Sequence, residues 1–201
     1  MPRANRCYLE GHIWHITHRC HRRRFLLRFV RDRRAWVGWL YEARARFGLC
    51  VLDYTVTSNH VHLLVRDRGL GEIADSMQLI AGRTAQAFNE RKERNGAFWE
   101  DRYHATAVDI DNVDRLAALH REWVDAALQT RVAVERADYW TESMAVGGAS
   151  FVKAVQAKLG ARASERSMDS VSLSDGLFAL REPEIAYSFI LDTESESLRQ
   201  F

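Results

Sequence analysis

The sequence predicts an α+β fold: a ferredoxin-like split βαβ antiparallel sheet with helices on one face, followed by a partly helical C-terminal tail. Two observations lead to this prediction. Short segments that alternate in polarity or are rich in β-branched residues are separated by two longer segments in which apolar residues recur every three or four positions. Their order along the chain is strand, helix, strand, strand, helix, strand.

The first strand and helix are predicted within residues 12–47. Residues 12–20 place His12, Trp14, Ile16 and His18 on one face and Ile13, His15, Thr17 and Arg19 on the other, which is typical of a strand. Residues 30–47 carry apolar side chains at helical spacing, and Gly48 follows as a residue that commonly ends a helix.

The remaining elements of the sheet follow the same logic. Residues 49–57 are rich in Val, Leu, Tyr and Thr, and residues 60–65 resume this pattern after a short turn, which predicts a hairpin. Residues 72–94 have apolar positions at helical spacing and predict a second long helix. Residues 106–110 predict a short extended segment.

The pattern weakens in the last third of the chain. Residues 151–159 predict a short helix, whereas residues 163–174 are rich in serine and poor in large apolar side chains. We therefore divide the chain into a domain of residues 1–112, which holds the predicted sheet, and a helical and irregular tail of residues 113–201.

Composition excludes several classes of protein. No apolar segment approaches the roughly 20 residues that span a bilayer, and the first residues lack the apolar core of a signal peptide, so we expect a cytoplasmic protein with no membrane partner. Cys7, Cys20 and Cys50 are odd in number and form no CxxC pair. They indicate reduced cysteines and neither a disulfide framework nor a thiolate zinc site.

Charge is distributed unevenly along the chain. Residues 1–104 hold 19 Lys or Arg and 11 Asp or Glu, a net charge of +8, and residues 105–201 have a net charge of −6. A basic first half predicts contact with a polyanion, although a solvated surface is the alternative. The densest basic run contains arginines, whose planar guanidinium binds phosphate through two nitrogens. These are Arg19, Arg22, Arg23 and Arg24.

The sharpest local signal is the pair His60 and His62. Residues two apart in a strand share a face, so these imidazoles project side by side while Val61 and Leu63 point into the core. Two imidazoles at this spacing can bind one divalent cation and leave positions open for a phosphate oxygen or water. The alternative is a pair of strand histidines with no ligand.

Several motifs occur in one order between residues 12 and 108. They are HITHRC from residue 15, a basic helix, VTSNHVHLLV from residue 56, MQLIAGRT from residue 77 and GAFWEDRY from residue 96. This series resembles the single-tyrosine HUH transposases, and more narrowly the IS-two-hundred-like transposase domain, which includes the REP-associated tyrosine transposases.

The resemblance implies a metal-dependent chemistry on DNA. It implies that His60 and His62 hold Mg²⁺ or Mn²⁺, which polarises a scissile phosphate, and that a tyrosine attacks this phosphate to form a 5′-phosphotyrosine bond. Cleavage and rejoining of single-stranded or hairpin DNA would follow. Relatives often act as dimers, so a homodimer is one alternative that the sequence leaves open.

The expected nucleophile is where this sequence departs from its relatives. The family usually carries its tyrosine on the helix that follows the last motif, but residues 113–129 contain no tyrosine. Either Ala118 occupies the position of the nucleophile or the segment that bears it has been deleted. Tyr103 is a weak candidate to replace it, because it belongs to the separate GAFWEDRY motif.

Three functions are consistent with these residues. The one we favour is DNA binding without catalysis; the others are an active single-strand transposase and a metal-dependent phosphodiester hydrolase that uses water as its nucleophile. Further contacts with the DNA backbone are expected from basic residues of the second helix and the last motif, with simple solvent exposure as the alternative. These are Arg83, Arg91, Lys92 and Arg102.

Overall fold

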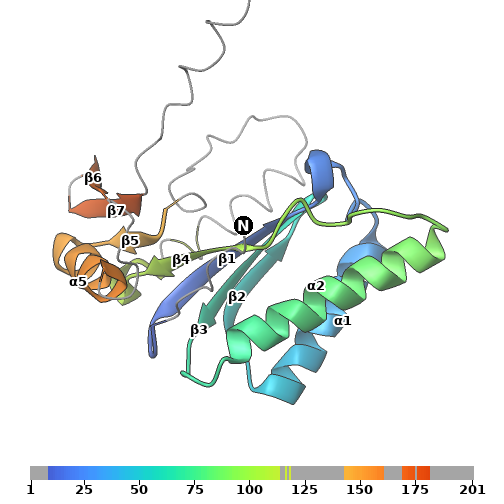
Figure 1. Cartoon of the computed structure of the whole chain (residues 1–201), viewed down its shortest axis with the longest axis horizontal. Helices are drawn as coiled ribbons and strands as arrows, with labels where there is room; N and C mark the ends of the chain where they lie inside the picture. The colour runs from blue at the N-terminus through green and yellow to red at the C-terminus, as the bar shows by residue number, and fades with distance from the viewer. Residues whose placement is uncertain are drawn as a thin grey trace, which may run out of the picture.

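A computed structural model describes residues 9–113, 116, 118, 143–160, 169–174 and 176–181. In this part of the chain, strands form a single sheet in the order β2-β3-β1-β4-β5-β7-β6 (Figure 1). The strands are β1 (Ile13–Arg19), β2 (Cys50–Val56), β3 (His60–Arg66), β4 (His104–Val108), β5 (Ala145–Gly147), β6 (Asp169–Ser174) and β7 (Leu177–Arg181). The helices are α1 (Val30–Phe47), α2 (Glu72–Arg91) and α5 (Ala149–Gly160), with short 3-10 turns η1 (His21–Arg23) and η2 (Ile110–Asn112).

The predicted α+β fold class is confirmed. Strand β1 pairs antiparallel with both β3 and β4, and β2 pairs antiparallel with β3. Helix α1 has the predicted bounds, because Gly48 adopts the left-handed backbone (φ 72°) that ends a helix. Helix α2 ends at Arg91, three residues earlier than predicted, and Glu93 just beyond it has a positive φ of 47°.

The three strands that follow β4 were not predicted from the sequence. Strand β5 runs parallel to β4, β7 pairs antiparallel with β5, and β6 completes the sheet beside β7. Only three residues make up β5, which is too short for an alternation to show, and β6 is rich in serine. Strands from both sides of residue 112 share one sheet. The division of the chain into two parts at this residue stays a prediction.

The sheet has two unlike faces. One face packs under the helices in the main core, where Trp14, Ile16 and Leu63 meet Trp36 of α1 and Met77 of α2. Helix α5 covers the same face further along the sheet, because its Val152 joins this core together with Ala145 and Leu180. The opposite face carries a smaller apolar cluster that includes Ile13, Leu64, Val108 and Val146. None of the described helices is long and apolar enough to cross a membrane.

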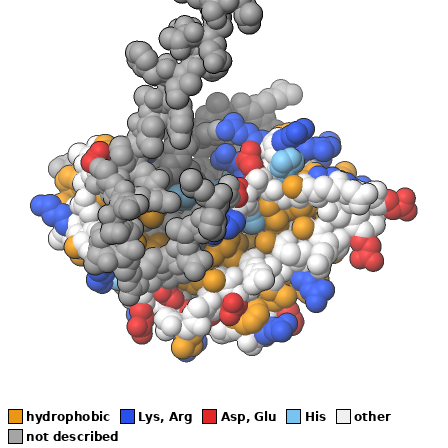
Figure 2. Space-filling view, in the orientation of Figure 1, with side chains coloured by type: hydrophobic (Ala, Val, Ile, Leu, Met, Phe, Trp, Pro, Cys, Tyr) orange, Lys and Arg blue, Asp and Glu red, His pale blue; other side chains and the backbone are white. Residues whose placement is uncertain are grey.

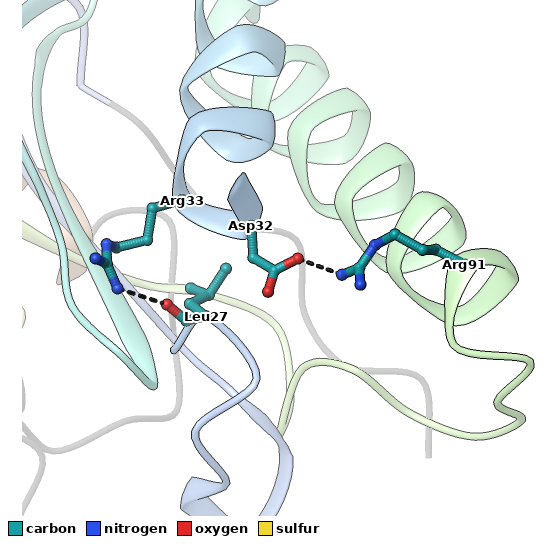
Figure 3. Close-up of polar contacts among 4 residues, drawn as sticks. All are labelled: Leu27, Asp32, Arg33 and Arg91. Atoms are coloured by element: carbon teal, nitrogen blue, oxygen red, sulfur yellow. Dashed lines mark hydrogen bonds and ion pairs between the residues drawn. The ribbon is translucent and has the colours of Figure 1, made fainter. Parts of the chain in front are cut away.

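An ion pair joins the two helices that cover the first strands. The Arg91 guanidinium at the end of α2 contacts the Asp32 carboxylate at the start of α1 (Figure 3). Nearby, the Arg33 guanidinium donates a hydrogen bond to the Leu27 carbonyl at 3.1 Å and so ties α1 to the segment before it. Because Asp32 is only 5% exposed, losing this partner would leave a buried carboxylate without a cation beside it.

We expect Arg91→Ala to lower the free energy of unfolding by about 2 kcal/mol, because it leaves the Asp32 carboxylate buried without its cation. Arg91 itself is 29% exposed, so solvent screens part of the interaction. Gln86→Ala on the exposed surface of α2 is the control, with an expected change of less than about 0.5 kcal/mol. Urea denaturation measures both. Equal midpoints for the two variants would contradict the assignment.

Candidate metal and nucleic-acid site

Strand β3 places its two histidines on the face of the sheet that is turned away from the helices. Val61, Leu63 and Val65 of this strand lie in the main core, so the alternation puts His60 and His62 on the opposite face. Their ring centroids are 4.7 Å apart, with the planes at 79°. The two imidazoles are therefore neighbours, as the spacing predicts.

Pairing with β1 and β4 completes this histidine face. Arg19 of β1 lies opposite His60, and Thr17 lies opposite both His62 and His104. Residues directly opposite in antiparallel strands share a face, so Arg19 and His104 stand on the same side of the sheet as the histidine pair. The His104 Nε2 donates to the Ser143 carbonyl at 3.0 Å. We use the term histidine face for the side that bears His60, His62 and His104.

Hydrogen bonds orient the His60 ring. Its Nδ1 lies 2.7 Å from the Asn59 side-chain oxygen and 2.9 Å from the Thr57 hydroxyl. An amide oxygen can only accept, so the proton of His60 resides on Nδ1, which donates it. The lone pair of the neutral ring is then on Nε2, the nitrogen that a metal would bind.

The His62 ring has a second histidine as its partner. Its Nδ1 lies 3.0 Å from the Nε2 of His15, and the two ring planes are nearly parallel, at 8°, with 5.2 Å between centroids. Both side chains are buried, with 0% exposure for His15 and 3% for His62. No role was predicted for His15 from the sequence, because alternation gives the face of a residue within its strand but not the register between strands.

The residues of this face fit a divalent cation that takes some of its ligands from the protein and the others from substrate and water. Each of His60 and His62 has its Nδ1 engaged by a neighbour, which leaves Nε2 as the atom for coordination. Within the described ranges, no group of three or more His, Cys, Asp or Glu side chains could hold a metal. The protein would therefore supply two imidazole nitrogens to the cation. Phosphate and water oxygens, which are the ligands that Mg²⁺ and Mn²⁺ prefer, would complete the coordination.

A basic loop follows β1 and lies beside the start of β3, the strand that carries the histidine pair. We call residues 19–24 the arginine loop; Arg22 and Arg23 in it are exposed and adopt positive φ values of 52° and 55°. The Cys20 amide donates to the Asn59 carbonyl at 2.7 Å, and the Asn59 side-chain amide donates to the Arg23 carbonyl at 3.2 Å. These bonds fix the arginine loop to the turn immediately before His60. Figure 2 shows basic side chains gathered where Figure 1 draws η1.

The other predicted DNA contacts divide into two groups. Arg102 is exposed in the segment that runs beside β1, where the Glu100 amide donates to the Arg19 carbonyl at 2.9 Å. The remaining candidates lie on or just after α2, away from the histidine face. Arg83 lies over the Trp39 ring, Arg91 is engaged by Asp32, and Lys92 lies over the Phe29 ring.

Two exposed phenylalanines next to the arginine loop were not singled out in the sequence. Phe25 is 67% exposed and Phe29 is 55% exposed, while the guanidinium of Arg28 lies 5.9 Å from the centre of the Phe29 ring. Aromatic side chains beside cations are typical of surfaces on which unpaired bases stack. In the sequence they read as ordinary apolar residues before a helix, and only their exposure distinguishes them.

Comparison with known proteins identifies the family. The model of the family described as "Transposase IS200 like" matches residues 8–118, more than half of the chain. This chain belongs to the IS200-like transposase family. No curated protein matches it.

Solved structures show where the IS200-like fold recurs. A REP-associated tyrosine transposase bound to a REP hairpin is 15% identical, with a TM-score of 0.51 over 66% of this chain and 76% of that one. A candidate transposase of Deinococcus radiodurans R1 is also 15% identical, with a TM-score of 0.42 over 63% of this chain and 98% of that one. The first likeness supports the shared fold.

The IS200-like chain has no described tyrosine on its histidine face. The Tyr103 ring contacts His18 edge to face at 6.2 Å, and His18 is on the helix-covered side of β1, so Tyr103 points away from His60 and His62. Tyr54 pairs with Leu63 on that same side, where partial burial raises the pKa of its phenol, and Tyr41 lies on α1. This geometry argues against Tyr103 as the nucleophile. Tyr8, Tyr139 and Tyr187 lie outside the described residues.

A groove of about 1520 Å³ lies on the helix-covered side and is separate from the histidine face. Its lining includes Met77 and Ala81 of α2, Trp99, and Lys158 of α5. Trp99 stacks on His18 at 4.0 Å and donates its indole N–H to the Ala81 carbonyl at 3.0 Å. Trp99 therefore has a packing role.

Cys20 is a buried residue of the arginine loop, and burial raises the pKa of its thiol to about 12. The thiolate is the reactive form, so this thiol stays neutral and unreactive at pH 7 to 9. We expect iodoacetamide to modify the partly exposed Cys50 in the native protein and to leave Cys20 intact. Peptide mass mapping measures both. Equal labelling of the two thiols at pH 8 would contradict the burial of Cys20.

Proposed function

We propose that this IS200-like transposase relative binds single-stranded or hairpin DNA at the histidine face and the arginine loop, and that it forms no 5′-phosphotyrosine bond. His60 and His62 would hold Mg²⁺ or Mn²⁺. The observation that carries the proposal is the set of hydrogen bonds joining the arginine loop to Asn59, because it places cationic side chains beside the histidine pair.

The arrangement suits a phosphate backbone. Arg22, Arg23 and Arg24 are exposed, and guanidinium groups bind phosphate oxygens with two parallel hydrogen bonds. Arg19 lies across from His60, so one strand of DNA can contact the arginine loop and the histidine face together. A bound divalent cation would supply polarisation of a phosphodiester there, while His60 and His62 present their Nε2 atoms to it.

No tyrosine of the described residues lies on the histidine face, which favours binding without catalysis. All three tyrosines of the described residues are on the helix-covered side of the sheet, and residues 113–129 contain no tyrosine. Phosphodiester transfer through a tyrosine requires the phenol within reach of the polarised phosphate. The hairpin in the complex of the REP-associated relative makes hairpin DNA the first ligand to test.

Fluorescence anisotropy with labelled hairpin, single-stranded and fully duplex DNA of one length tests the binding claim. We expect the hairpin and the single strand to bind more tightly than the duplex, with affinity that falls as salt rises because phosphate contacts release counterions. Sedimentation of the complex shows whether a homodimer binds. Equal affinity for all three DNAs, or binding that salt does not weaken, would contradict the proposal.

A further inference from the structure

We propose that His15 is a positioning residue that makes His62 a metal ligand by accepting a hydrogen bond from its Nδ1–H. This inference rests on the proposed metal site at His60 and His62 and adds to it the residue that sets which nitrogen of His62 is available. The inference concerns which of the two rings carries the proton of their shared hydrogen bond, and both rings stay neutral.

Geometry limits what His15 and His62 can do. The 3.0 Å between the His15 Nε2 and the His62 Nδ1 is a hydrogen-bond distance, and both side chains are almost inaccessible to solvent. Adjacent, directly paired strands hold them: β1 carries His15 and β3 carries His62. The hydrogen bond between these nearly parallel rings, whose planes differ by 8°, restricts rotation of the His62 ring.

Counting protons leaves two arrangements for this neutral pair. In the first, the His62 Nδ1 donates to the His15 Nε2, so the His62 Nε2 carries a lone pair and the proton of His15 is on its own Nδ1. In the second, the His15 Nε2 donates to the His62 Nδ1, and the proton of His62 is then on Nε2, where it blocks coordination. Only the first arrangement makes His62 a ligand.

The second proposed ligand, His60, is also held in one tautomer by a hydrogen-bond partner. At His60, the Asn59 oxygen can only accept, so it selects the Nδ1 proton without an alternative. At His62, an imidazole takes the place of an amide oxygen, and His15 must itself adopt the matching tautomer. We therefore expect the affinity of the site for metal to depend on residue 15, although residue 15 supplies no ligand.

The test compares three variants of the full chain. His15→Phe keeps an aromatic ring but removes the acceptor nitrogen, and His15→Gln offers an amide oxygen in its place. His18→Phe is the matched control: His18 is also buried on β1, but it is on the opposite face, where its Nε2 bonds to the Asp101 carbonyl at 2.8 Å. Electron paramagnetic resonance of free Mn²⁺ measures affinity, and ¹⁵N NMR of the imidazoles with and without Mg²⁺ reports their tautomers.

We expect His15→Phe to weaken Mn²⁺ binding by roughly 10- to 100-fold, the usual effect of losing a partner of a metal-bound histidine. His15→Gln should recover part of this loss, and His18→Phe should bind Mn²⁺ like the unaltered protein. The NMR spectrum of the unaltered protein should show His62 protonated on Nδ1, and His15→Phe should shift it towards a mixture of tautomers.

Two results would overturn the inference about His15 without overturning the proposed metal site. One is unchanged Mn²⁺ affinity in His15→Phe while His60→Ala/His62→Ala abolishes binding, which would leave the metal site intact and remove only the role of His15. The other is a proton on the His62 Nε2 in the unaltered protein, which decides the question even if His15→Phe does not fold. Absence of Mn²⁺ binding by the unaltered protein would instead overturn the proposed metal site together with this inference.

Discussion

Replacing His60 and His62 with alanine is expected to weaken Mn²⁺ binding by more than about 100-fold, because loss of a single outer partner of a metal ligand already costs roughly 10- to 100-fold. The two imidazoles are the nitrogen donors of the proposed site, and the described residues add no third side chain to them. Isothermal titration with Mn²⁺ measures the change. DNA binding without metal should persist, since the arginine loop is unaltered.

His104→Ala is the control for this pair. His104 shares the histidine face, opposite Thr17, but its Nε2 donates to the Ser143 carbonyl. We expect this variant to keep its Mn²⁺ affinity within a few-fold of the unaltered protein. Loss of binding in His104→Ala equal to that in the double variant would show that the site is centred between the strands and not on β3.

Replacing Arg22, Arg23 and Arg24 with glutamine is expected to give the largest loss of DNA affinity. Each phosphate contact to a single strand contributes about −0.7 to the slope of log affinity against log salt, so three lost contacts should make that slope less negative by about 2. The loss should be greatest at low salt. Anisotropy titrations between 50 and 300 mM salt, roughly the range over which such contacts weaken, measure it.

A second triple variant controls for the change in charge. Arg44, Arg46 and Arg66 are also exposed, but they lie near the opposite end of the sheet, where Cys50 pairs with Arg66 and α1 ends. Their replacement by glutamine removes the same net charge. We expect it to change the slope by less than half as much, whereas equal slopes for the two triples would show that overall charge, and not the arginine loop, determines binding.

Periodicity in the sequence predicted the elements that form the sheet of the site and the helix behind it. The helical spacing in residues 30–47 and the stop at Gly48 correspond to α1, and the hairpin around Asn59 corresponds to β2 and β3. These signals are local, because each depends on side chains that alternate or repeat within one element. The same alternation placed His60 and His62 on one face.

Contacts between distant segments could not be predicted in this way. The approach of His15 to His62 depends on the register of β1 against β3, and the attachment of the arginine loop depends on bonds to Asn59, 36 residues from Arg23. Strand β6 has little apolar pattern of its own, and it joins the sheet beside β7. In each case the deciding interaction joins residues that no local pattern relates.

The most direct test of the central claim is a search for a covalent adduct between the protein and labelled hairpin or single-stranded DNA in Mn²⁺, by denaturing electrophoresis beside a native gel. The account predicts DNA that shifts in the native gel and runs free and uncut in the denaturing gel. An adduct that is lost in His60→Ala/His62→Ala would contradict it and show that a tyrosine reaches the histidine face. Cut DNA without an adduct would also contradict it and indicate hydrolysis by water.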